Sequence, residues 1–320
     1  RWLTPGAPPL ELKWTPAVRA RYGRQEPLPA DAEEQALKRG TQWFIDSKLL
    51  LDRSRLGDNW KSLAAAGGLM AKYPSGLAPT PSANAPVGDG SLGILEAPLS
   101  VIQADGSQLQ GVARRGDCTG ESAMALAFGG KVLGNLQQAA IARNLLDFWY
   151  FTSDACKRER GDPEHGAYGL IAWGIDSPAW YRANYGDDNA RLLLGTLAAA
   201  ALLEEDRWDE PVMRCLLANL RTTGQLGFRG DRIDIPALSQ HGWEPLFLRR
   251  KVNYLPHMEA YLWACYLWAY EHTGCDLFRE RAKTAIRMTM ARYPDGWTWM
   301  NGLAQEKARI LLPLAWLVRL

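Results

Sequence analysis

The sequence has little of what metal and disulfide chemistry requires. Its 320 residues include five cysteines, an odd number with no CxxC pair and no obvious pairing. The four histidines show neither HExxH nor any other spacing typical of zinc ligands. We therefore expect neither a bound metal nor another cofactor.

Excess charge and long apolar runs are also missing. The formal net charge is +2 and no stripe of lysine and arginine occurs, so nucleic acid and anionic membranes are not expected as partners. No charge-free run of about eighteen apolar residues is present, which argues against a membrane span. The 47% of hydrophobic residues is enough for a large core. The oligomeric state stays open.

Tryptophan, by contrast, is abundant, with fourteen in the chain. Five of them lie on apolar helical faces, where a core position is expected; these are Trp43, Trp149, Trp263, Trp268 and Trp316. Three others, Trp180, Trp297 and Trp299, fall in turn-like segments just before expected helix starts. There an aromatic ring can serve as a platform for the flat apolar face of a ligand.

Four long apolar helices are predicted to open next to an acidic residue. The segments are GESAMALAFGG from Gly120, DDNARLLLGTLAAAALL from Asp187, MEAYLWACYLWAY from Met258 and QEKARILLPLAWLVRL from Gln305. Self-similarity at a spacing of roughly 50 to 70 residues is typical of a repeated helical hairpin, since one amphipathic pair cannot bury its apolar face alone.

The periodicity predicts about eight helices, which differ in character. The ranges are about 34–50, 119–133, 136–152, 188–204, from Glu210 onward, 256–273, 277–292 and 304–319. The helix at 256–273 is apolar nearly all round, whereas the one at 277–292 has a single apolar stripe. Buried inner helices wrapped by amphipathic outer ones indicate an all-α fold, a double-layered (α/α) barrel or toroid.

Two parts of the chain are expected not to be helical. Residues 1–30 are rich in proline and predict an extended N-terminal arm. Turn residues and short apolar runs predict a small irregular or β-hairpin insertion around 75–115. Residues 31–320 are then expected to form a single catalytic domain. Eight helices are too few to close its ring.

The segments YGDDNAR, PHMEAYLWA and WTWMNGLAQEKAR resemble inner-helix starts of the six-hairpin glycosidase superfamily, the (α/α)6 toroids. The resemblance covers roughly residues 31 to 320 and does not single out one family. It implies twelve helices in a closed ring. It also implies an active site at the wide end, where the inner helices begin.

Cleavage of a glycosidic bond requires one protonated carboxyl group and one ionised carboxylate. The catalytic candidates are the acids at the helix starts, namely Asp188, Glu259, Glu121, Glu306 and Asp187. The alternative for each is a first-turn acid that only stabilises the helix N-terminus. The adjacent pair at 187 and 188 is the strongest, because one acid can cap the helix while the other projects inward.

Polar and aromatic residues near these acids are candidates for substrate binding. They are Trp180, Tyr185, Arg182, His257, Tyr254, Trp299 and Asp117. Arg191 and Arg309 lie three residues beyond an acid on the same helix, so local ion pairs are expected for them. Arg114, Arg115 and Arg229 fall in loops, where they would bind the carboxylate of an acidic sugar.

The preferred hypothesis is a glycoside hydrolase that acts on polysaccharide or oligosaccharide fragments. Acids on neighbouring helices are separated by about 8–10 Å less the reach of their side chains, which favours the wide spacing of inverting enzymes. Glu259 or Glu306 is the expected acid and Asp188 the base. We expect Glu121, Asp188, Glu259 and Glu306 to converge on one cavity, lined by at least two of Trp180, Tyr185 and Trp299.

Two other classes remain open. One is a polysaccharide lyase or sugar epimerase on the same ring, with Tyr185, Tyr254 or His257 as the base. The other is a non-catalytic helical scaffold that binds a glycan. The first residue is Arg1 rather than Met, so we expect a targeting segment to have been removed or never included. Glycan degradation favours a periplasmic or extracellular location, whereas the unpaired cysteines argue against it.

Overall fold

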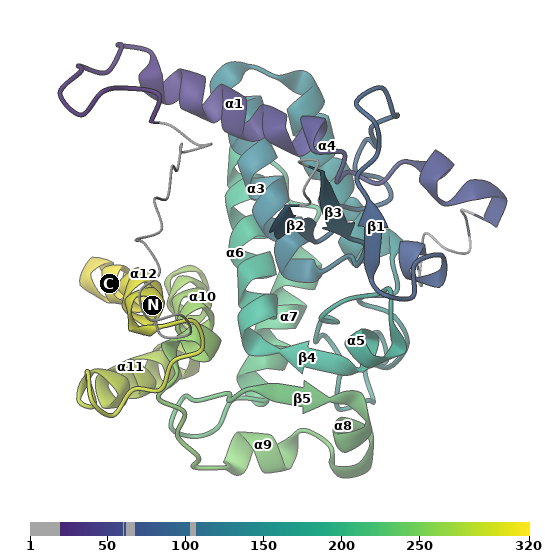
Figure 1. Ribbon diagram of the computed structural model, residues 1–320. Helices are drawn as coiled ribbons and strands as arrows, with labels where there is room; N and C mark the ends of the chain where they lie inside the picture. The colour runs from purple at the N-terminus through teal and green to yellow at the C-terminus, as the bar shows by residue number, and fades with distance from the viewer. Residues whose placement is uncertain (1–19, 60, 62–67, 103–106) are drawn as a thin grey trace, which may run out of the picture.

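The computed structural model describes residues 20–59, 61, 68–102 and 107–320 and is mainly helical (Figure 1). The described residues contain eleven α-helices. They are α1 (Ala32–Asp46), α3 (Gly116–Leu133), α4 (Leu136–Asp147), α5 (Pro178–Arg182), α6 (Gly186–Leu203), α7 (Asp209–Arg221), α8 (Ile235–His241), α9 (Glu244–Leu248), α10 (Pro256–Thr273), α11 (Asp276–Met290) and α12 (Leu303–Arg319). None of these helices is long and apolar enough to cross a membrane.

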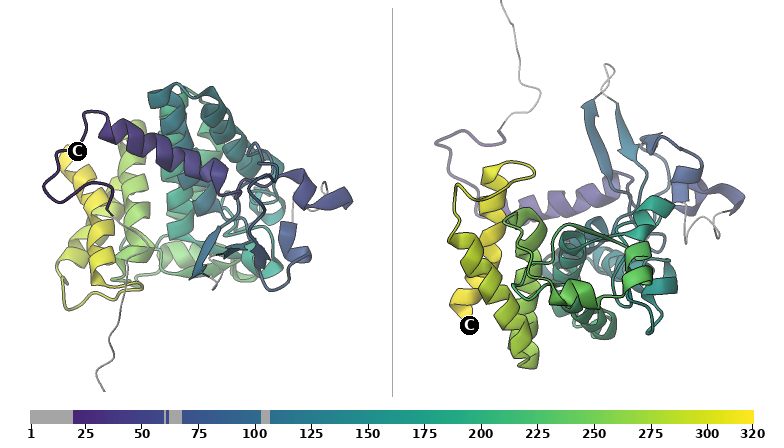
Figure 2. Two further views of the ribbon diagram at one scale, coloured as in Figure 1. Left: turned by 45° about the horizontal axis from the view of Figure 1, so that its top comes forward. Right: turned by 90° about the horizontal axis from the view of Figure 1, so that it is seen from below.

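Four of the long helices pack side by side, in the order α3, α6, α10, α12, and we call them the central row (Figures 1 and 2). Between successive members the chain returns through α4, α7 and α11, which pack on α3, α6 and α10 respectively. The helix α1 crosses over α3. Because each outer helix brings the chain back, the central-row helices all begin at the same end.

The sequence explains this division into two layers. In α10, residues 262–267 are all buried, so the helix is surrounded on every side, and Gly274 ends it in the left-handed conformation with φ of 69°. In α11 the buried residues are Phe278, Ala282, Ala285, Ile286 and Thr289, a single stripe. The predicted contrast between inner and outer helices is confirmed for this pair.

Two glycines bring α3 and α6 into backbone contact. A Cβ atom added to Gly195 would lie 2.3 Å from the carbonyl oxygen of Gly120, and one added to Gly120 would lie 2.7 Å from the Cα of Leu192. Both positions therefore need the absence of a side chain. This approach sets α3 and α6 as the tightest pair of the central row.

Two small antiparallel sheets lie outside the helices. The first, in the order β1 (Leu77–Pro79), β3 (Gln108–Gly111), β2 (Ala97–Ile102), occupies the insertion predicted around 75–115. The second pairs β4 (Ala183–Tyr185) with β5 (Arg232–Asp234) and was not predicted. It joins the segment before α6 to the segment before α8.

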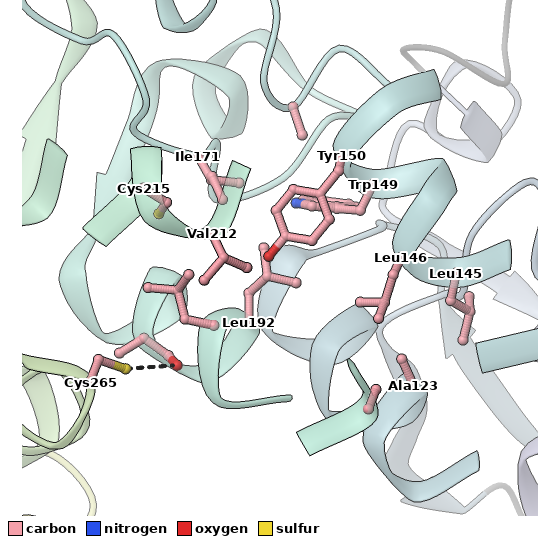
Figure 3. Packing of buried hydrophobic residues seen from close by; sticks show 14 of the residues in the cluster. Ala123, Leu145, Leu146, Trp149, Tyr150, Ile171, Leu192, Val212, Cys215 and Cys265 are labelled. Carbon is pink, nitrogen blue, oxygen red and sulfur yellow. Dashed lines mark hydrogen bonds between the residues drawn. The ribbon is translucent and has the colours of Figure 1, made fainter. Parts of the chain in front are cut away.

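The core lies between the two helical layers (Figure 3). Trp149 and Tyr150, just beyond α4, pack in one buried cluster with Leu192 of α6 and Val212 of α7. Trp149 and Trp263 are fully buried, as predicted. The prediction of a core position for Trp43 is wrong: this side chain in α1 is 46% exposed.

The architecture agrees with the expected class but not with its complete ring. The described residues hold eleven helices, several of them short, where a closed toroid of this kind has twelve, and closure is not shown. Residues 20–30 contain no helix or strand, while the remainder of the predicted arm lies outside the described residues.

Replacing Gly195 with alanine tests the contact between α3 and α6. The new methyl group would overlap the backbone of Gly120, so we expect the free energy of unfolding to fall by about 1–3 kcal/mol. Gly40→Ala in α1 is the control, because nothing lies within 4 Å of its Cβ position. There the higher helix propensity of alanine should raise stability by up to about 1 kcal/mol. Equal effects of the two changes in urea titrations would contradict the packing described.

Candidate active site

The starts of the four central-row helices meet in one cluster of charged side chains. Arg115 and Asp117 come from the start of α3, and Asp187 and Asp188 from the start of α6. His257 lies in the first turn of α10, and Arg309 lies two turns into α12. Ion pairs connect Arg115 with Asp117 and Asp188, and a second group of contacts connects Asp187 with His257 and Arg309. We call these residues, together with Glu121 and Arg191, the carboxylate cluster.

Arg115 joins α3 to α6. Its Nη2 atom lies 2.9 Å from Oδ2 of Asp117 and 2.8 Å from Oδ1 of Asp188. Its Nη1 atom donates to Glu96, just before β2, at 2.8 Å. Two carboxylates from different helices therefore share one guanidinium nitrogen.

Arg191 makes the second connection between these helices. It donates to Oδ2 of Asp117 at 2.5 Å and to both oxygens of Glu121, at 2.7 and 2.8 Å. The expected local ion pair within α6 is wrong, because both partners belong to α3. The spacing along one helix did not reveal that a neighbouring helix offered two acids.

Arg309 connects α12 to α6 and α10. Its Nη1 atom donates to Asp187 and, at 2.8 Å, to the carbonyl oxygen of His257. Here too the expected partner on the same helix is wrong. The guanidinium lies over the ring of Tyr261, 4.8 Å from its centroid. The Nε2 atom of His257 lies 3.7 Å from Asp187.

Burial changes the acid strengths in the cluster. It raises the pKa of Asp188 to about 7, with the negative charge of Asp117 as the next cause. Burial also raises the pKa of Asp187 to about 6, while Arg309 and Arg191 act in the opposite direction. Burial, Arg309 and Arg191 together lower the pKa of His257 to about 4, so its imidazole is neutral near pH 7.

Glu121 is the most accessible acid of the cluster, with 44% of its side chain exposed. Together with Arg191 it lines a cavity of about 320 Å³ bounded by α3, α6, α10 and α12. The other walls are apolar or aromatic, formed by Met124, Leu194, Tyr261 and Leu312. This carboxylate is therefore open to a ligand in the cavity.

Glu259 is placed differently from the other acids. It is fully buried and accepts hydrogen bonds from the backbone N–H groups of Arg229 (2.9 Å) and Gly230 (2.7 Å) and from the side chain of Asn253 (2.9 Å). Burial raises its pKa to about 7. These bonds hold the segment after α7 against α10, so we assign Glu259 a structural role.

Glu306 is also fully buried. Its carboxylate accepts from the backbone N–H of His257, in the first turn of α10, and from that of Met300 at 3.0 Å. It thus stabilises the start of α10 and the turn before α12. Because neither Glu259 nor Glu306 reaches solvent, we do not retain either as the candidate acid.

An aromatic wall stands beside Arg115. Trp180 stacks on Trp173 with 4.3 Å between ring centroids, Tyr185 meets Trp173 edge-on at 5.3 Å, and the guanidinium of Arg115 lies 5.1 Å from the Trp173 ring centroid. Trp180 and Tyr185 were predicted near the site. Trp173 was missed, since it lies in an irregular segment with no periodic pattern.

The remaining candidates lie farther out. Arg182 faces a separate cavity of about 860 Å³ between α5 and α8, lined also by Tyr181 and Ile235. Tyr254 packs edge-on against Phe228, with 5.6 Å between ring centroids. Trp299, in the turn before α12, is 59% exposed.

Two loop arginines are unsuited to bind a substrate carboxylate. Arg114 is fully buried in an ion pair with Asp176. Arg229 is fully buried as well and donates to Asn184 and to Thr222. The expectation that they act as carboxylate clamps is wrong, because their guanidinium groups do not reach the surface.

Comparisons with known proteins add no assignment. No protein-family model matches the chain, and no curated protein matches it either. Among the described residues, no group of three or more histidine, cysteine, aspartate or glutamate side chains could hold a metal ion.

Substituting Glu259 tests its structural role. Glu259→Ala would leave the backbone N–H groups of Arg229 and Gly230 without this acceptor and remove one of the two acceptors of Asn253, so we expect a loss of about 3–5 kcal/mol in the free energy of unfolding. Glu280→Ala, at a site 60% exposed on α11, should change stability by less than about 0.5 kcal/mol. Thermal unfolding of both variants provides the measurement, and a Glu259→Ala protein as stable as the wild type would remove this role.

Proposed function

We propose that the protein is a glycoside hydrolase that acts on polysaccharide or oligosaccharide fragments. The observation that carries the proposal is a pair of carboxyl groups in contrasting surroundings at the mouth of the central row. Asp188 is almost buried, whereas Glu121 opens onto a cavity. Acids whose surroundings separate their protonation states suit the two roles that glycosidic cleavage requires.

Asp188 is the proposed general acid. Its side chain is 9% exposed, and burial raises its pKa to about 7, so a large fraction keeps its proton near neutral pH. Only Oδ1 is held by Arg115, which leaves the other oxygen to protonate the glycosidic oxygen. We assign Asp188 the role of acid, and not the role of base expected from the sequence, because its burial favours the protonated form.

Glu121 is the proposed base that activates water. Both of its oxygens accept hydrogen bonds from Arg191, which orients the carboxylate. It lies one turn beyond Asp117 on α3 and faces the cavity. A water molecule in that cavity can donate a proton to Glu121 as its oxygen attacks the anomeric carbon.

The order of ion pairs supports inversion of the anomeric centre. Between Asp188 and Glu121 stand Arg115, Asp117 and Arg191, each bonded to the next. We infer that these intervening side chains hold the two carboxyl groups farther apart than the roughly 5–5.5 Å of retaining enzymes.

The fold is consistent with an (α/α) toroid of the six-hairpin superfamily. Its support is the parallel central row, the returning outer helices and a polar cluster where the inner helices begin. Trp173 and Trp180 would provide the flat apolar wall for a sugar ring. Arg115, which bonds to the proposed acid, lies against this wall.

One observation favours a lyase or epimerase instead. His257 is neutral near pH 7, and its Nδ1 atom is buried without a hydrogen-bond partner among the described residues. A neutral imidazole in this position can abstract a proton next to a carboxylate. The nature of the product distinguishes the reactions, since a lyase leaves an unsaturated sugar that absorbs in the near ultraviolet.

Activity on a panel of purified polysaccharides and oligosaccharides tests the proposal. We expect released reducing ends without an ultraviolet-absorbing product, and a loss of turnover of about 10²–10⁴-fold in Asp188→Asn and in Glu121→Gln. Glu280→Gln on the outer helix α11 is the matched control and should retain wild-type turnover. An unsaturated product would support the lyase, and near-normal turnover in Asp188→Asn would remove it from the mechanism.

The stereochemistry of the product is a separate prediction. Proton NMR recorded during the first turnovers should show the anomeric configuration opposite to that of the substrate, because water attacks from the side away from the leaving group. A first-formed product with the configuration of the substrate would rule inversion out and require a nucleophile much nearer to Asp188.

A further inference from the structure

Asp117 is the most deeply buried acid of the carboxylate cluster, and the proposed reaction assigns it no step. Only 1% of its side chain is exposed. Its Oδ2 atom accepts from Arg115 and Arg191, whereas its Oδ1 atom is buried and has no hydrogen-bond partner among the residues that the structure describes. A buried carboxylate oxygen without a partner is costly, so its surroundings call for an explanation.

A second observation concerns the neighbour of Asp117. The Nη2 atom of Arg115 binds Asp117 and Asp188 at 2.9 and 2.8 Å, which brings these two carboxyl groups together around one nitrogen. Two ionised carboxylates this close repel each other strongly in a buried site, and a single proton held by the pair relieves this repulsion.

We propose that Asp117 and Asp188 share one proton, and that Asp117 is thereby the positioning residue for the proposed acid. The proton resides on Asp188, on the oxygen that Arg115 does not bind, and the negative charge of Asp117 favours it there. The use made of this proton rests on the proposed hydrolase function, whereas the sharing itself does not.

In the reaction the proton passes from Asp188 to the glycosidic oxygen as the bond to the anomeric carbon breaks, and the electron pair of that bond goes to the oxygen. Water attacks the carbon and gives its proton to Glu121. Solvent then returns a proton to Asp188 and takes one from Glu121, so the sum is the addition of one water molecule. The negative charge of Asp117 favours the reprotonation of Asp188.

Other groups also influence the shared proton. Arg115 opposes the protonation of Asp188, because its positive charge attracts the ionised carboxylate. The negative charge of Asp187 favours the protonated form. The titratable and charged residues around Asp188 are Arg115, Asp117 and Cys118 of α3, Asp187 and Arg191 of α6, Glu96 before β2, and, beyond Asp187, His257 of α10 and Arg309 of α12. Asp117 binds the same nitrogen of Arg115 as Asp188 does, so removal of the Asp117 charge should shift the titration of Asp188 most.

Carbon-13 NMR titration of the aspartate side chains in the full protein tests the inference without any substrate. Asp188 is assigned from the signal missing in Asp188→Asn. In Asp117→Asn the amide still accepts from the two arginines but carries no charge, so the midpoint of the Asp188 titration should fall by about one pH unit or more. Glu96→Gln is the matched control, because Glu96 binds the other nitrogen of Arg115, and its shift should be much smaller.

An unchanged Asp188 midpoint in Asp117→Asn, or equal shifts in both variants, would overturn the inference. Should Asp117→Asn not fold, the wild-type titration decides: a shared proton requires two coupled steps, the upper one above about pH 6, and two independent steps at ordinary aspartate values would contradict it. If glycans are cleaved, the alkaline limb of kcat/KM should move with the Asp188 midpoint. If none is cleaved, the hydrolase proposal fails while the titration still decides on the proton.

Discussion

The arrangement of this protein depends on charge balance at the buried starts of four helices. Asp117, Glu121, Asp187 and Asp188 are drawn together by the packing of α3 and α6, and carboxylates cannot be buried together without compensation. Three arginines provide it. Each of them binds an acid on another helix or shares one nitrogen between two acids, so the same ion pairs that neutralise the site also hold the helix starts in register.

The apolar remainder of the central row makes this concentration of charge possible. Because α10 is buried on all sides and α6 meets α3 at glycine, the helices pack closely over most of their length, which brings the acids of their buried first turns together. Two further acids serve the framework: Glu306 stabilises the start of α10, and Glu259 fastens the segment after α7. Acidic residues near helix starts therefore serve either the carboxylate cluster or the framework. The depth of burial and the hydrogen-bond partners of each acid distinguish the two uses.

Local patterns predicted the helices well and their side-chain partners poorly. The boundaries of the helix at 256–273 agree with the prediction, because proline at its start, glycine after its end and a continuous apolar run are all local signals. The partners of Arg191 and Arg309 lie 70 and 122 residues away, and no spacing within one helix reveals them. Trp173 and the pairing of β4 with β5 went unpredicted for the same reason, as did the buried positions of Glu259 and Glu306.

The central claim is that a glycan binds where the carboxylate cluster meets the aromatic wall. A crystal structure of Asp188→Asn soaked with an oligosaccharide that the wild type cleaves tests this most directly, because the variant should bind the substrate without turning it over. We predict the scissile bond between residue 188 and Glu121, with a sugar ring against the wall formed by Trp173 and Trp180. An oligosaccharide bound away from both acids, for instance in the cavity between α5 and α8, would contradict the account.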